Sequence, residues 1–156
     1  MIRYIPIETP ASWTDADCAD LLSFDWRTST AKFIFCERET PTSVAKKWDQ
    51  ILVVTFDAAE VIVRMLDEFP LSTESDPQDW DGLAPHHFAY LVEGDPFFTA
   101  QSSAWRSLAP NLKHYLFMTG NGCLDVITSA TPRFGILDAD RDTDGASDAL
   151  SIKSRI

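Results

Sequence analysis

The sequence predicts a single α+β domain, built predominantly on an antiparallel β-sheet with one or two short helices. Segments typical of strands outnumber segments typical of helices, and the two kinds do not alternate as they do in parallel βαβ folds. The chain has 156 residues, a length that suits one domain with a sizeable core. We expect residues 1–137 to form this domain and residues 138–156 to form an acidic C-terminal tail.

The first third of the chain predicts one short helix followed by two strands. Thr14 is placed to cap a helix over residues 15–22, because a threonine hydroxyl accepts a hydrogen bond from the amides of the first turn. The runs 32–37 (KFIFCE) and 51–56 (ILVVTF) are rich in aromatic and β-branched residues, which favour strands.

Residues 58–69 admit two interpretations. A capping pattern at residues 57–60 and an apolar stripe with helical spacing favour a helix. The β-branched run Val61-Ile62-Val63 favours a strand, which would form a hairpin with residues 51–56. The hairpin is the preferred prediction.

A long acidic loop follows at residues 67–85, where prolines at positions 70, 77 and 85 exclude a continuous helix or a central strand. Long loops of this kind in compact domains are often functional. A tryptophan surrounded by carboxylates could anchor a basic partner, or it could fold back onto the core beneath its own loop. The predicted partner-binding residues are Glu74, Asp76, Asp79, Trp80 and Asp81.

The second half of the chain predicts three strands and a helix. Residues 86–92 are typical of a strand, and Asp95 followed by Pro96 predicts the start of a helix that extends to Leu108. The runs 113–118 (KHYLFM) and 123–128 (CLDVIT) flank the turn 119–122 (TGNG), whose glycines and asparagine accept positive φ. These two runs predict a hairpin at the centre of the core.

Composition and charge exclude several classes of protein. The net charge is −11, and residues 57–95 contain ten acidic residues and one basic residue. This balance disfavours nucleic-acid binding and suits a basic protein partner or a cation. No apolar run approaches the ~20 residues of a membrane span. Three widely spaced cysteines without a CxxC pair are typical of a protein of the reducing cytoplasm, so we expect a soluble cytoplasmic protein.

Histidines and one strand aspartate are the candidates for catalysis. His86 and His87 point to opposite faces if their segment is a strand, so they do not share one ion without a bulge. His114 could lie beside one of them. Asp125 is expected to face solvent, with a catalytic role as the alternative. No metal-binding or nucleophile motif includes these residues.

The tail contains the pattern 140–148 (DRDTDGASD), with carboxylates at relative positions 1, 3, 5 and 9 and a glycine at position 6. The pattern resembles the first nine positions of an EF-hand loop and the D-x-D-x-D-G-x-x-D loops of integrin-type repeats. It predicts weak Ca²⁺ binding by Asp140, Asp142, Asp144 and Asp148, because Ser151 replaces the bidentate glutamate at position 12. The alternative interpretation is a solvated acidic tail.

The middle of the chain resembles small bacterial immunity-type proteins of toxin systems, on the segments 51–56, 66–74, 113–117 and 123–126. The resemblance implies a protein without catalytic residues that neutralises a toxin through an acidic surface. We therefore expect a non-enzymatic binding protein that uses residues 67–81. The alternative is a small hydrolase-like or ligand-binding enzyme that uses His86 or His87, His114 and Asp125.

Overall fold

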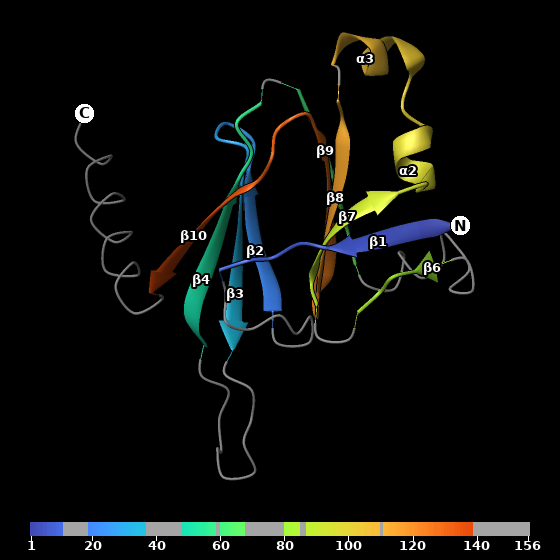
Figure 1. The fold of residues 1–156 in the computed structure, drawn as a ribbon. Helices are drawn as coiled ribbons and strands as arrows, with labels where there is room; N and C mark the ends of the chain where they lie inside the picture. The colour runs from blue at the N-terminus through green and yellow to red at the C-terminus, as the bar shows by residue number, and fades with distance from the viewer. Residues whose placement is uncertain are drawn as a thin grey trace, which may run out of the picture.

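The protein folds into two β-sheets that pack face to face, with two short helices at one end (Figure 1). The computed structural model describes residues 1–10, 19–36, 48–58, 60–67, 80–84, 87–109 and 111–138. The six-stranded sheet has the order β5 (Val61–Leu66), β9 (Gly122–Thr128), β8 (Lys113–Thr119), β7 (Ala89–Glu93), β1 (Ile2–Pro6) and β6 (Trp80–Asp81). The four-stranded sheet has the order β10 (Arg133–Asp138), β4 (Trp48–Thr55), β3 (Thr30–Cys36) and β2 (Ala19–Asp25).

Every strand pair is antiparallel except β1 with β6, so the expected sheet-dominated, mainly antiparallel fold is confirmed. Among the described residues the helices are α2 (Pro96–Thr99) and α3 (Ser103–Leu108). Neither of them is long and apolar enough to cross a bilayer, and the described ranges hold no helix that is.

Aromatic side chains fill the space between the two sheets. Phe33 and Phe35 of β3 are fully buried, and the ring centroid of Phe33 lies 5.2 Å from that of Phe117 in β8. The predicted 113–128 hairpin forms the facing wall, because Tyr115, Phe117, Leu124 and Val126 all belong to this inner cluster. Alternation along the strands therefore places the expected residues in the core.

The opposite face of the six-stranded sheet is also buried. A second cluster there contains Ile2, Tyr4, Tyr90, Val92, Leu116 and Cys123. The strands β8 and β9 are consequently buried on both faces, whereas antiparallel strands with one solvated face show polar residues at every second position. Figure 1 shows α2 lying near this outer face, beside β1 and β7.

The turn of the β8–β9 hairpin joins the two sheets. The Asn121 side chain accepts a hydrogen bond from the Leu21 amide at 2.9 Å and donates one to the Leu21 carbonyl at 3.3 Å. The Gly120 amide donates to the Ala19 carbonyl at 2.9 Å. A two-residue turn of one sheet therefore pairs with an edge strand of the other.

Three predictions of local structure are corrected. Residues 61–66 are a strand, but they pair with β9 rather than with residues 51–56, because both sides of β4 are occupied by β3 and β10. The predicted helix over residues 15–22 is wrong from Ala19 onward, where β2 begins. The predicted helix from Pro96 to Leu108 is divided in two, because the Ser102 hydroxyl accepts a hydrogen bond from the Trp105 amide and caps a new helix.

Candidate functional site

Three charged or titratable side chains meet on the outer face of the six-stranded sheet. Asp125 in β9 accepts hydrogen bonds on both of its oxygens. His114 Nε2 lies 2.6 Å from Asp125 Oδ1, and Arg64 Nε donates to Asp125 Oδ2 at 2.9 Å. Arg64 Nη2 lies 2.8 Å from the same Oδ2 atom. We refer to Arg64, Asp125 and His114 as the polar network.

The register of three neighbouring strands produces this arrangement. Arg64 in β5 is the direct cross-strand partner of Asp125, and His114 in β8 is the partner of Ile127, two residues further along β9. Direct and diagonal neighbours on one face of a sheet lie within reach of long side chains. The network therefore joins β5, β8 and β9, although Arg64 and Asp125 are 61 residues apart in sequence.

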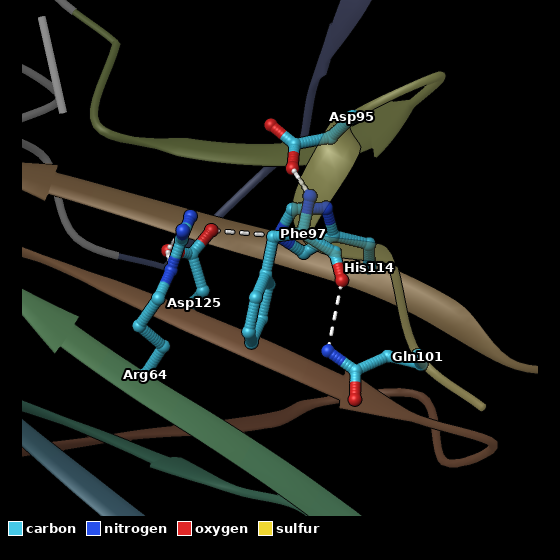
Figure 2. A network of polar contacts seen from close by, with 6 residues as sticks. All are labelled: Arg64, Asp95, Phe97, Gln101, His114 and Asp125. Carbon is cyan, nitrogen blue, oxygen red and sulfur yellow. Dashed lines mark hydrogen bonds and ion pairs between the residues drawn. The ribbon is translucent and has the colours of Figure 1, made fainter. Parts of the chain in front are cut away.

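Phe97 of α2 covers the polar network (Figure 2). Its ring centroid lies 4.0 Å from the guanidinium carbon of Arg64, within the range of a cation–π contact, and 5.7 Å from the His114 ring. The backbone of Phe97 is held on both sides. Its amide donates to the Asp95 carboxylate at 2.6 Å, and its carbonyl accepts from the Gln101 side chain at 2.8 Å.

The network is largely shielded from solvent. The side chains of His114 and Asp125 are 1 % exposed, and that of Arg64 is 17 % exposed. The prediction that Asp125 faces solvent is therefore wrong. Phe97, 28 residues earlier in the chain, covers the face of the sheet on which Asp125 lies. Arg64 of β5 pairs with the charge of Asp125. The alternation of residues along a strand predicts neither the cover by Phe97 nor the charge partner in β5.

The second ring nitrogen of His114, Nδ1, is not bonded to Asp125. Nδ1 is buried and has no hydrogen-bond partner among the residues that the structure describes. The Asp125 carboxylate accepts the hydrogen bond, so Nε2 carries the shared proton. In the neutral tautomer with this proton, the lone pair is on Nδ1. A carboxylate that orients a histidine in this way leaves its second nitrogen able to accept a proton or a hydrogen bond.

Tyr4 in β1 lies on the same face of the sheet and is 4 % exposed. Burial raises the pKa of its hydroxyl, and the negative charges of Asp95 and Asp125 raise it further. The hydroxyl therefore stays protonated throughout the physiological range. Its ring packs edge-to-face against Tyr90 at 5.8 Å and against Trp80 at 6.1 Å.

Of the predicted catalytic candidates, the structure brings together His114 and Asp125. His87 precedes β7, whereas Val92 at the other end of β7 pairs with His114, so His87 is roughly 17 Å away along the strand at about 3.4 Å per residue. His86 lies outside the described residues. Within the described ranges, no group of three His, Cys, Asp or Glu side chains is placed to hold a metal ion.

The predicted partner-binding residues are described only in part. Trp80 is half-buried in β6, where it packs against the second cluster, and Asp81 beside it is exposed. β6 is an edge strand of the six-stranded sheet. Glu74, Asp76 and Asp79 lie outside the described residues, as do the predicted calcium ligands Asp140, Asp142, Asp144 and Asp148.

Arg64 and Phe97 are members of the site that sequence reasoning did not identify. One signal for Arg64 was present, since it is the one basic residue among the ten acidic residues of segment 57–95. A lone cation inside an apolar β-branched run needs a buried carboxylate partner. No comparable signal exists for Phe97, whose role depends on where α2 lies.

Comparisons with known proteins give no family for this chain. No protein-family model matches it, and neither the curated proteins nor the solved structures contain a significant match.

Proposed function

We propose that this protein is a non-enzymatic cytoplasmic binding protein that engages a basic protein partner through the acidic segment 67–81, as an immunity or inhibitor protein would. One observation carries the proposal. Exposed Asp81 stands beside half-buried Trp80 on an edge strand, within residues 57–95, which have a net charge of −9. A fixed aromatic residue in an acidic stretch of sequence suits recognition of a cationic surface.

The packing of Trp80 supports a preformed surface. Its edge-to-face contact with Tyr4 and its place in the second cluster hold the indole against the sheet. β6 also pairs in parallel with β1, where Asp81 is the register partner of Arg3. Rigid anchors lower the ordering cost of binding, because fewer side-chain rotamers are lost when the partner arrives.

The test uses the product of the neighbouring open reading frame as the probe, in stopped-flow association with the full chain. Asp81→Lys is expected to slow association at low salt, and the triple change of Asp76, Asp79 and Asp81 to Lys is expected to slow it further. Both effects should shrink as salt is added, because exposed charges are screened beyond about 8 Å at physiological ionic strength.

Glu8→Lys is the matched control. Glu8 is exposed and the substitution makes the same change in charge, but the residue lies outside segment 57–95. Equal slowing by Glu8→Lys and Asp81→Lys would reduce the effect to net charge. An association rate that Asp81→Lys and the triple variant leave unchanged at low salt would refute the proposal.

A second candidate function is a small hydrolase-like or ligand-binding enzyme centred on His114 and Asp125. The 2.6 Å hydrogen bond between them supports it, since a carboxylate-oriented histidine is a common general base. The closed position of both side chains beneath Phe97 weighs against it. The test measures hydrolysis of p-nitrophenyl acetate. A rate above that of free imidazole, lost in His114→Gln, would support this candidate. A rate equal to that of free imidazole would reject it.

A further inference from the structure

Among the described residues, four strands form the edges of the two sheets, and three of them carry a feature that hinders the addition of another strand. β6 has two residues, and β2 has a register shift between Leu21 and Ser23. β5 carries Arg64, whose guanidinium group is turned inward to Asp125. Short edge strands, bulges and inward-pointing charges are devices by which β-sheet proteins avoid pairing edge to edge. The fourth edge is β10, which lies beside β4 (Figure 1).

β10 is regular along its whole length and apolar at its centre. It pairs with β4 over six consecutive positions, from Arg133 to Asp138, without a register shift. The residues between these two, 134–137 (FGIL), include no charge and no proline. Ile136 and Leu137 are 40 % and 38 % exposed, and as neighbours on a strand they point to opposite faces of the sheet. No described strand pairs with the other side of β10, so this edge is open to a further strand.

The outer face of the four-stranded sheet has a depression of about 300 Å³ at this edge, lined by Val53, Thr55, Arg133, Phe134 and Gly135. Gly135 leaves this space open, because a Cβ there would meet no atom within 4 Å. Leu137 lies two residues further along β10 and therefore on the same face as Gly135. An exposed leucine and an open depression thus lie next to each other on one strand.

We propose that β10 pairs antiparallel with β10 of a second copy of this chain, about a two-fold axis at Gly135. In this register Phe134 lies opposite Ile136 of the second copy, and Arg133 lies opposite Leu137 of the second copy. Direct and diagonal neighbours on one face are within reach of each other, so Leu137 of each copy reaches the depression beside Gly135 of the other. The symmetry makes every contact twice and joins the two four-stranded sheets into one of eight strands.

The charges of β10 favour this antiparallel arrangement of two copies. A parallel pair would place the two Arg133 side chains next to each other. In the antiparallel pair they are four positions apart, about 14 Å at roughly 3.4 Å per residue, which exceeds the screening length of ~8 Å at physiological ionic strength. The uncharged centre of the strand offers nothing to a basic partner, so this surface is independent of the function proposed for segment 67–81.

The first test is sedimentation equilibrium of the full chain from about 10 µM to about 1 mM. One pair of six-residue strands is a small interface beside the ~1,200 Å² of stable complexes, so we expect a dimer with a dissociation constant on the order of 10⁻⁴ M. Each copy carries a net charge of −11, so added salt should tighten the dimer by screening this repulsion. The amide shifts of residues 133–138 should change with protein concentration. A monomer at about 1 mM, or concentration-dependent shifts at residues 61–66 of the β5 edge instead, would refute the proposal.

Charges placed at Gly135 test the position of the two-fold axis. Gly135→Asp and Gly135→Lys should each weaken the dimer about tenfold or more, because the axis sets each new charge opposite its own copy. An equimolar mixture of the two variants should restore the dimer, since Asp then lies opposite Lys, and this rescue also shows that both variants fold. Met65→Lys, at an exposed position of the β5 edge, is the control and should leave the dimer unchanged. A mixture that stays monomeric, or equal weakening by Met65→Lys, would overturn the proposal.

Discussion

The ring of Phe97 lies over the guanidinium group of Arg64, with 4.0 Å between the guanidinium carbon and the ring centroid. A residue of a four-residue helix thus covers a charge that belongs to an edge strand of the sheet. The contact depends on Asp95, whose carboxylate caps α2 and holds the Phe97 amide. Helix capping and burial of the polar network are therefore coupled.

Substitution of Asp125 by Asn should strongly destabilise the fold. The change keeps the shape of the side chain but leaves the partly buried Arg64 and the buried His114 without a carboxylate. Breaking a buried ion pair on one side costs about 3–5 kcal/mol in the free energy of unfolding, measurable by urea denaturation. Glu93→Gln is the control, because its ion pair with Arg3 is exposed and worth less than about 1 kcal/mol. Equal losses for the two variants would contradict a buried network.

Substitution by alanine is expected to change the free energy of unfolding in different ways at Gly82 and at Gly135. Gly82 has φ +84°, and a Cβ there would lie 2.3 Å from the Tyr4 carbonyl oxygen, so Gly82→Ala should cost more than about 1–2 kcal/mol of unfolding free energy. At Gly135 in β10, a Cβ meets no atom within 4 Å, so Gly135→Ala should be neutral or stabilising by about 0.5–1 kcal/mol. Chemical denaturation measures both. A tolerated Gly82→Ala would show that β1 and β6 are not held at this distance.

Stability should fall at high pH. Burial raises the pKa values of Tyr4, Tyr90 and Tyr115, whereas tyrosines in the unfolded chain ionise near pH 10. Below about pH 10 both states are protonated and this stability is fully present. Above it the unfolded state releases protons first, so the free energy of unfolding decreases as pH rises toward the folded-state values. Urea denaturation between pH 8 and pH 11 measures the decrease.

Tyr4→Phe is the variant that checks this mechanism. It keeps the ring but removes the hydroxyl, so the decrease above pH 10 should become shallower than in the unaltered protein. Tyr4 is the informative position because the charges of Asp95 and Asp125 add to the effect of burial there. An unchanged slope would assign the decrease to other groups.

The calcium prediction for the tail concerns the carboxylates of Asp140, Asp142, Asp144 and Asp148. Calorimetric titration should give weak binding, with a Kd of about 10⁻⁴–10⁻³ M, because the bidentate ligand at position 12 is missing. Asp144→Ala should abolish the heat of binding. The absence of heat at millimolar calcium would favour the solvated acidic tail instead.

Local sequence patterns predicted the parts of the fold that are held by neighbouring residues. The 113–128 hairpin, its turn and the inward positions of Phe117 and Leu124 follow from alternation and turn chemistry. The partner of Val61–Leu66 could not be predicted in this way, since the chain crosses to the other sheet within a few residues of Thr55. Pairing over such separations depends on the whole topology.

The candidate site shows the same limit. His114 and Asp125 were recognised as candidates, but their contact depends on a diagonal register, and their burial depends on Phe97. Buried strands with two covered faces lose the alternation that distinguishes an interior aspartate from a solvated one. Arg64 carried the one available signal, an isolated cation in an apolar run.

The side chain of Asn121 has a consequence for self-association. β2 is an edge strand, and an uncovered edge offers its amides and carbonyls as a template on which another chain can add a strand. The side-chain amide of Asn121 hydrogen-bonds both the backbone N–H and the carbonyl of Leu21. The backbone N–H of Gly120 donates to the Ala19 carbonyl. Loss of this side chain would expose a ready starting point for aggregation while leaving the two cores in place.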